Sequence, residues 1–391
     1  TLRMDRYRQT AEDLVRTGKA YHCYCSKERL EKLREEQMAA GLKPRYDGRC
    51  RDRSEPEPGV VPVIRFRNPD AGTVVFQDKI KGKIEWSNAE LDDLVLFRSD
   101  GFPTYNFAVV VDDIDMKITD VIRGDDHVNN TPRQVNIYHA LGAEVPNFAH
   151  LPMILGPDGQ KLSKRHGAVG VMQYRDDGFL PHALLNYLVR LGWSHGDQEI
   201  FSREQMIELF DVADVNHSAS RFDLEKLAWL NQQYLKHDDP LELAPHFEWQ
   251  LRAAGLDPQQ GPAPADVIVA LRDRARTLKE MAEKSAIWYG PIAHWDDTAV
   301  AKHLRAPTAV PALKAVHETL DAVSEWNVEN VHKAIETAAA SIGENMGKVA
   351  QPLRVAMTGT QVSPSIDHTV YLVGKTRALR RIDDALARTG T

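Results

Sequence analysis

The chain has 391 residues, of which 42% are hydrophobic and 27% charged, and its net charge at pH 7 is −7. This length suffices for roughly two to four domains with apolar cores. Three cysteines in so long a chain argue against a disulfide scaffold. No apolar run approaches the roughly 20 residues of a membrane helix, and residues 1–20 lack a signal-peptide segment, so we expect a cytoplasmic protein without membrane contact.

The first part of the chain has the pattern of a small α/β module. Tyr7, Ala11 and Leu14 share one face of a helix that ends at Gly18, and Ser26 can cap a second helix that stops at Gly41. Apolar runs bounded by turn residues predict strands at residues 21–25, 63–67, 73–77 and 94–98.

From residue 117 the pattern changes to alternating strands and helices. A strand is expected at 118–122, a helix that begins at Thr131 with Pro132 in its first turn, and a strand at 149–155. This alternation predicts a parallel sheet.

Beyond residue 181 nearly every segment has helical periodicity. A capping box, Ser202 to Gln205, announces one helix. Further helices are expected at residues 183–191, 224–235, 267–286 and 328–341, with joints near 258–264 and 307–311. The second half is therefore expected to be an α-helical domain or pair of domains.

A cationic loop follows the glycine-rich turn at residues 156–159. Lys161 and Lys164 provide point charges, and Arg165 provides a guanidinium that can bind two oxygens at once. Such groups suit a triphosphate, because attack on the α-phosphate builds negative charge on its oxygens and on the departing pyrophosphate. The alternative interpretation is an ordinary solvated surface loop.

Basic residues cluster at residues 43–53 and at the C-terminal end of the chain. An acidic total charge therefore does not exclude basic patches that bind a nucleic acid. The candidate phosphate-binding residues in the second cluster are Lys375, Arg377, Arg380 and Arg381.

Several motifs occur in a fixed order along the chain. They are Phe102-Pro103-Thr104-Tyr105-Asn106-Phe107, Arg123-Gly124-Asp125-Asp126-His127, Asn129-Asn130-Thr131-Pro132-Arg133-Gln134, the loop 161–167 and the segment 185–193. Together they closely resemble bacterial glutamyl-tRNA synthetases, which are class I aminoacyl-tRNA synthetases. The resemblance extends from Tyr7 to Arg381.

The resemblance implies an α/β fold: a Rossmann-type catalytic domain with an α/β acceptor-binding insertion, followed by all-α anticodon-binding domains. On this basis residues 1–105 hold part of the catalytic domain and the insertion, and 106–167 hold its second half with the cationic loop. Residues 168–235 form a helical stem-contact domain and 236–391 the anticodon-binding region. The implied ligands are ATP, Mg²⁺, L-glutamate and tRNA(Glu), bound by a monomer.

The resemblance also assigns roles to individual residues. Lys164 is expected to contact the ATP phosphates, assisted by Lys161 and Arg165. Asp126 is expected to face the adenosine ribose; the family usually has Glu where this chain has Asp125. Arg123 is expected to hold a carboxylate of glutamate and Tyr105 to contact the same amino acid.

Alternatives remain for these positions. Arg123 can instead form a structural ion pair with Asp113 or Asp125, and Tyr105 can be a core residue. The run Asp125-Asp126-His127 can also be read as metal ligands, although adjacent residues of a strand point to opposite faces.

The family's other ATP signature, a Pro-Thr-Gly and His-x-Gly-x region, does not occur in the chain. In the family it precedes the position of Thr1. We therefore expect an N-terminally truncated form that binds tRNA but cannot make aminoacyl-tRNA alone.

Three cysteines are spaced as in a zinc site. Cys23 and Cys25 project from the same face of a strand, and a returning loop can bring Cys50 to them. Some glutamyl-tRNA synthetases carry such a site, with a histidine two residues after the third cysteine, where this chain has Asp52. We expect Asp52 as the fourth ligand, with Tyr46 or His22 as substitutes; three reduced cysteines without metal are the alternative.

Other functions fit parts of the pattern. A glutaminyl-tRNA synthetase is the nearest, but its anticodon domain is a β-barrel, whereas residues 267–387 are expected to be helical. A catalytically silent tRNA-binding paralogue would explain the absent signature. An enzyme that glutamylates a modified tRNA base lacks the helical region beyond residue 224, and a generic nucleotidyltransferase does not need Arg123 and Tyr105.

Overall fold

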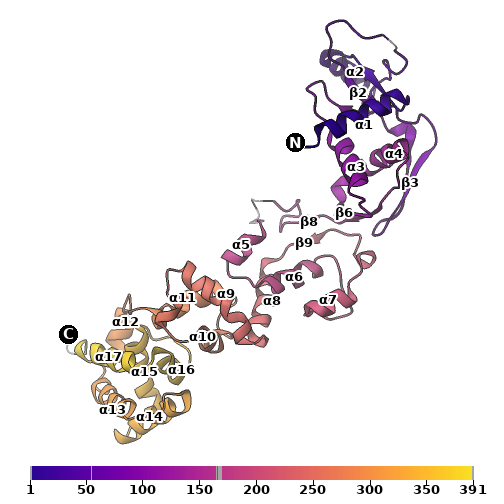
Figure 1. The fold of residues 1–391 in the computed structure, drawn as a ribbon. Coiled ribbons are helices and arrows are strands. Elements are labelled where there is room, and N and C mark those ends of the chain that lie inside the picture. The colour runs from indigo at the N-terminus through magenta and orange to yellow at the C-terminus, as the bar shows by residue number, and fades with distance from the viewer. Residues whose placement is uncertain (1, 54, 164, 166–169, 390–391) are drawn as a thin grey trace. The chain divides into compact units, whose positions relative to one another are not determined.

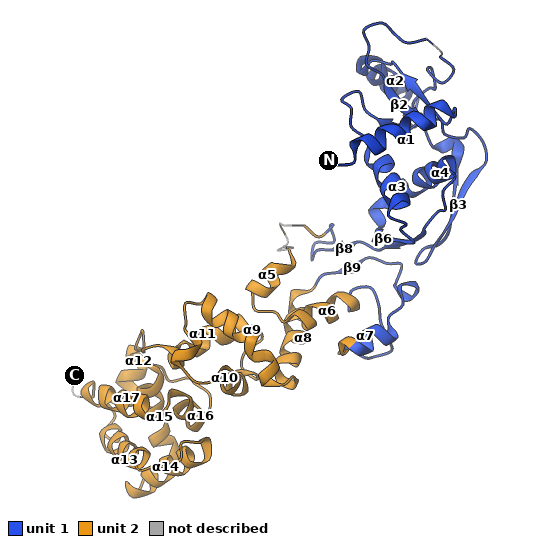
Figure 2. Ribbon diagram, viewed as in Figure 1, with its two compact units in different colours: residues 1–161, 190–199, 204–222 blue, residues 162–189, 200–203, 223–391 orange. Residues whose placement is uncertain are grey.

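The computed structural model describes residues 2–53, 55–163, 165 and 170–389. The chain divides into two compact units, coloured separately in Figure 2. The first contains residues 1–161, 190–199 and 204–222, and the second contains residues 162–189, 200–203 and 223–391. Within the described ranges, the helices are all too short or too polar to cross a membrane.

Three helices build the main core of the first unit: α1 (Met4–Arg16), α3 (Tyr105–Asp115) and α4 (Thr131–Leu141), all visible in Figure 1. The predicted face of α1 is confirmed, since Tyr7, Ala11 and Leu14 are buried in this core. The Tyr7 hydroxyl also donates to Asp112 of α3 at 2.8 Å. Helix α1 is thereby attached to α3 by both apolar and polar contacts.

A three-stranded antiparallel sheet has the order β1 (Ala20–Cys23), β2 (Val63–Phe66), β5 (Val95–Phe97). The helix α2 (Lys27–Ala39) follows β1, and the side chain of Ser26 accepts the Arg29 N–H at 3.3 Å, as the cap prediction requires. The predicted strands of this region are confirmed within a few residues.

The second sheet has the order β4 (Gly82–Ser87), β3 (Thr73–Asp78), β7 (Asn147–Leu151), β6 (Asp120–Gly124). β3, β7 and β6 are parallel, which confirms the predicted parallel sheet, and β4 pairs antiparallel with β3. β4 is an unpredicted strand, because Lys83 and Glu85 place two charges in a short segment whose outer face is solvated.

The strand expected at 149–155 is two strands. β7 ends at Leu151, Pro152 follows, and β8 (Ile154–Leu155) pairs with β9 (Ser220–Arg221) in a separate sheet. The interruption follows from proline chemistry, since Pro152 has no N–H for the ladder.

The second unit is helical, with elements α5 (Val171–Asp176), α6 (Pro181–Arg190), α8 (Leu224–His237), α9 (Pro240–Ala253), α10 (Pro264–Leu271), α11 (Leu278–Tyr289), α12 (Asp297–Ala299), α13 (Ala309–Asp321), α14 (Val328–Ser341), α15 (Met346–Thr358), α16 (Ile366–Val373) and α17 (Lys375–Ala387). Helix α7 (Arg203–Leu209) begins directly after the predicted cap, Ser202.

The single helix expected at 267–286 is wrong. It divides into α10 and α11, because Thr277 accepts the Glu280 N–H at 3.2 Å and Glu280 accepts the Arg276 N–H at 2.8 Å. Thr277 therefore caps a new helix, and Glu280 reaches back to the residue before this cap. The spacing of Thr277 and Glu280 is visible in the sequence and could have identified the break.

Candidate active site and candidate metal centre

Arg123 lies at the carboxyl end of β6, where ligands of parallel sheets usually bind. Its Nη2 donates to Thr131 Oγ1 and to Gln134 Oε1, both at 2.8 Å, and its Nε lies 3.2 Å from Nε2 of His150. These three partners are neutral side chains that hold the guanidinium in one orientation.

The alternative of a structural ion pair for Arg123 does not match these contacts. Asp113 instead accepts from the Tyr138 hydroxyl at 3.0 Å, and Asp125 pairs with Lys81 at 3.1 Å. No described carboxylate forms an ion pair with Arg123. Its positive charge therefore suits an anionic ligand.

Tyr105 is the first residue of α3 and is exposed, so the alternative of a core tyrosine is wrong. Its hydroxyl lies 3.4 Å from Nδ1 of His127, and the two ring centroids are 5.7 Å apart. The aromatic face and the hydroxyl are both accessible to a small ligand.

Asp126 follows β6 in a short 3-10 turn and forms an ion pair of 2.8 Å with Lys161. This hydrogen bond holds the pKa of Asp126 below its usual range. Lys161 is positioned by the predicted turn, in which Gly159 has a φ of 76° and donates its N–H to the Gly156 carbonyl at 3.0 Å. Two predicted nucleotide-binding residues are thus brought together.

The remaining predictions for the cationic loop have different outcomes. Lys164, His166 and Gly167 lie outside the described residues. Arg165 is described, is exposed and belongs to the second unit.

The cysteine prediction corresponds to a compact cluster. The Sγ atoms of Cys23, Cys25 and Cys50 all lie within 4.8 Å of one another, and this is the only candidate metal-ligating group found among the described residues. The run Asp125-Asp126-His127 therefore forms no such group in the described part of the chain.

Tyr46, not Asp52, completes the cluster. Its hydroxyl oxygen lies 3.4 Å from Cys23 Sγ and 3.6 Å from Cys25 Sγ, and accepts the Cys50 N–H at 3.0 Å. Three cysteine sulfurs are typical donors of structural zinc, and the Tyr46 oxygen would bring the number of donors to four.

The prediction of Asp52 as the fourth ligand is wrong. Its side chain is 91% exposed and pairs with Arg67 at 3.2 Å, away from the cysteines. His22 is exposed on the opposite face of β1 from Cys23, so it is also excluded as the fourth ligand.

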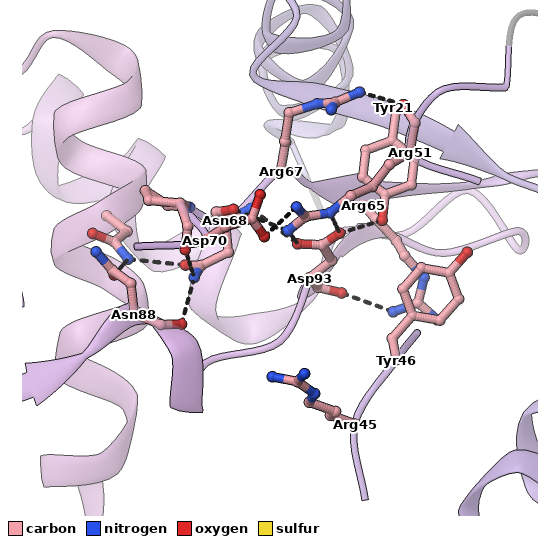
Figure 3. A network of polar contacts seen from close by, with 12 residues as sticks. Tyr21, Arg45, Tyr46, Arg51, Arg65, Arg67, Asn68, Asp70, Asn88 and Asp93 are labelled. Atoms are coloured by element: carbon pink, nitrogen blue, oxygen red, sulfur yellow. Dashed lines mark hydrogen bonds and ion pairs between the residues drawn. The ribbon is translucent and has the colours of Figure 1, made fainter. Parts of the chain in front are cut away.

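A polar network, shown in Figure 3, supports the cluster. The Arg65 guanidinium lies 4.0 Å from the centroid of the Tyr46 ring and donates to the Asp93 carbonyl at 2.8 Å. The buried Asp93 carboxylate accepts two bonds of 2.6 Å from Arg51, and it also accepts from the Tyr21 hydroxyl. Sequence reasoning missed Arg65 and Asp93, since no motif marks them.

The basic residues of α17 are engaged to different degrees. Lys375 donates to the Asp321 and Val323 carbonyls at 2.6 and 2.9 Å, and Arg377 donates to the Gln260 carbonyl at 2.7 Å. Arg380 is exposed. For these three, the predicted phosphate contact remains a prediction.

The predicted phosphate contact of Arg381 is wrong. Its side chain is buried and donates to the carbonyls of Met357, Ile287 and Gly290 at 2.5, 2.6 and 2.8 Å. Burial lowers the pKa of Arg381 to about 10. Arg381 therefore connects helices of the second unit.

Comparison with known families supports this arrangement. The profile of the family "tRNA synthetases class I (E and Q), catalytic domain" matches residues 1–229, and the "Anticodon binding domain" profile matches residues 241–386. The parallel sheet, the residues at its carboxyl end and the helical second unit define a class I aminoacyl-tRNA synthetase.

Comparison with individual relatives identifies the family within this class. A glutamate–tRNA ligase of Xanthomonas campestris pv. campestris is 61% identical over all of this chain and 84% of its own length, and one of Xylella fastidiosa is 59% identical with the same coverage. The crystal structure of a glutamate tRNA ligase from Elizabethkingia meningosepticum, in complex with its amino acid, superposes with a TM-score of 0.80 at 31% identity, covering 98% of this chain and 82% of that one. The chain belongs to the glutamate–tRNA ligase family.

Proposed function

We propose that the protein attaches L-glutamate to tRNA(Glu) in an ATP-dependent reaction that passes through glutamyl-adenylate. The observation that carries this proposal is the identity of about 60% to glutamate–tRNA ligases along the whole chain. Glutaminyl-tRNA synthetase and a silent paralogue are not favoured, since the relatives above are glutamate–tRNA ligases.

In the first step, a carboxylate oxygen of glutamate attacks the α-phosphorus of ATP, and pyrophosphate leaves. Arg123 binds a carboxylate of glutamate through its Nη1–H donors, because its Nε and Nη2 groups donate to His150, Thr131 and Gln134. Tyr105 supplies an exposed hydroxyl and ring beside the amino acid.

The nucleotide is held by residues that follow β6 and by residues that follow the glycine-rich turn 156–159. Asp126, paired with Lys161, faces the ribose, and Lys161, Lys164 and Arg165 neutralise charge on the phosphates. Bound Mg²⁺ supplies further positive charge to the phosphate oxygens.

The second step transfers the glutamyl group to the acceptor end of tRNA(Glu). We assign acceptor binding to the insertion within residues 1–105, stem contacts to 168–235 and anticodon binding to 236–391. Lys375, Arg377 and Arg380 contact phosphates there. The protein acts as a monomer in the cytoplasm.

We further propose a structural zinc ion held by Cys23, Cys25, Cys50 and Tyr46. All four donors lie in or beside the apolar cluster that joins β1 to the loop before β2. Zinc here ties these segments together and takes no part in the chemistry.

The test uses an enzyme preparation that contains this sequence, assayed for glutamate-dependent ATP–pyrophosphate exchange with tRNA present. Arg123→Lys should raise KM for glutamate on the order of tenfold or more with KM for ATP unchanged, and Lys164→Ala should slow exchange on the order of 10²-fold. Lys83→Ala, on the exposed face of β4, is the matched control. Charging of tRNA with glutamine in place of glutamate would contradict the proposal.

A further inference from the structure

A buried carboxylate and imidazole lie directly behind Arg123. Asp78 ends β3, His150 lies on β7 and Arg123 on β6, so the three residues occupy three adjacent strands of one sheet. The side chains of Asp78 and His150 are both 0% exposed, and Nδ1 of His150 lies 2.5 Å from Oδ2 of Asp78. A buried ionisable pair of this kind costs free energy unless it is satisfied.

The contacts at both ends of the imidazole select the same tautomer. The Asp78 carboxylate can only accept, so Nδ1 of His150 carries the hydrogen. The Nε–H of Arg123 can only donate, so Nε2 of His150 must present its lone pair to it, at 3.2 Å. The Thr131 hydroxyl also lies 3.0 Å from Nε2, and because a hydroxyl can donate or accept, it is compatible with this tautomer. By holding the hydrogen on Nδ1, Asp78 leaves Nε2 of His150 free to accept the Nε–H of Arg123.

Asp78 is itself fixed by the chain. Its Oδ1 accepts the Ile80 and Lys81 N–H groups at 3.0 and 2.9 Å. Burial alone would raise the pKa of Asp78, but hydrogen bonds from the Lys81 N–H and from His150 hold it below its usual range. Asp78 is thus an ionised acceptor.

The opposite side of the guanidinium is held by α4, which packs on β3. Thr131 and Gln134 accept from Nη2, and Gln134 donates its amide N–H to Asn106 at 2.9 Å, which turns its oxygen toward Arg123. Acceptors on β7 and α4 therefore define the plane of the guanidinium before any ligand arrives.

We propose that Asp78 and His150 are positioning residues for glutamate: Asp78 holds His150 in the Nδ1–H tautomer, and His150 orients the Arg123 guanidinium toward the amino acid's carboxylate. The inference rests on the proposed role of Arg123. Preorganisation raises affinity, since a long cationic side chain need not be ordered when the ligand binds.

The decisive variant is Asp78→Asn. Its Oδ1 can still accept the Ile80 and Lys81 N–H groups, whereas its Nδ2 now donates to Nδ1 of His150. The hydrogen of His150 then moves to Nε2, which faces the Nε–H of Arg123 as a second donor and competes with the Arg123 Nη2–H for Thr131 Oγ1. Asp120→Asn, an exposed carboxylate of β6 paired with Lys79, is the matched control.

Two readouts are required. Imidazole ¹⁵N NMR should show His150 protonated at Nδ1 in the wild type and at Nε2 in Asp78→Asn, and the Arg123 Nε–H signal should lose its protection from solvent exchange. Calorimetric titration with L-glutamate should give a dissociation constant raised at least about tenfold in Asp78→Asn and unchanged in Asp120→Asn.

A second pair of variants tests the inference even if Asp78→Asn fails to fold. His150→Gln keeps an acceptor within reach of Arg123 and should retain more glutamate affinity than His150→Leu at similar thermal stability. Equal affinity in these two variants, or an Nε2–H tautomer in the wild type, overturns the inference. A wild type that keeps the Nδ1–H tautomer and protected Arg123 Nε–H but binds no glutamate contradicts the proposed function alone.

Discussion

The hydroxyl oxygen of Tyr46 lies 3.4 Å from the Sγ of Cys23. The two residues come from different segments, the loop before β2 and the strand β1, and are both buried. Tyr46 therefore occupies the position of the fourth donor in the proposed zinc site.

Purified protein should contain about one zinc per chain, and Tyr46→Phe should lower this content because the oxygen donor is lost while the ring is kept. Asp52→Ala should leave zinc unchanged, since its carboxylate pairs with Arg67. Elemental analysis after dialysis is the measurement, and Tyr24→Phe is the control. Zinc lost in Asp52→Ala but retained in Tyr46→Phe would exclude the phenol as ligand.

Arg381 and Arg380 are adjacent but should behave differently. Arg381→Met should destabilise the protein by about 2–4 kcal/mol, because buried carbonyls lose their donors. Arg380→Ala should change stability by less than about 0.5 kcal/mol and weaken tRNA binding. Urea unfolding and filter binding at two salt concentrations measure these effects. Weaker tRNA binding by stably folded Arg381→Met would restore Arg381 as a phosphate contact.

Stability should fall as the pH decreases below about 6.5, in part through His150. Burial lowers the pKa of His150, and Arg123 on β6 and Lys81 act in the same direction, while Asp78 on β3 opposes them. As the pH falls, the unfolded chain binds this proton first. The contribution of neutral His150 to the free energy of unfolding is therefore complete above about pH 6.5. It is lost as the pH falls toward the lower pKa that His150 has in the folded protein. Urea midpoints at pH 7.5 and 5.5 should differ less in His150→Gln than in the wild type; equal differences would argue against this contribution.

Gly124→Ala should disturb the nucleotide site more than the fold. A Cβ at this position would lie 2.7 Å from Oδ1 of Asp126, so the exposed carboxylate must move, and we expect this shift to weaken its ion pair with Lys161. We expect KM for ATP to rise severalfold with a nearly unchanged melting temperature. Asp126→Asn should raise KM for ATP to a similar extent, as measured by ATP–pyrophosphate exchange. An unchanged KM for ATP in both variants would remove Asp126 from the ribose contact.

The sequence by itself determined the local elements and the family. Residues close together in the chain determine these features. They are the apolar face of α1, the Ser26 cap, the order of β6, α4 and β7, and the motifs from Phe102 to Trp193. Periodicity, capping and ordered motifs are local properties, and a local pattern can be read without coordinates. The three cysteines were also recognisable, because cysteine is rare in this chain.

Only the tertiary structure decided which of several equivalent residues takes each role. Tyr46 and Asp52 are both close to Cys50 in sequence, but the path of the loop turns the first toward the cysteines and the second into solvent. Likewise, Arg381 turns into the core while Arg380 remains exposed, because successive residues of a helix point about 100° apart. The contact between Asp78 and His150 spans 72 residues of chain and forms only because β3 and β7 become neighbours in the sheet.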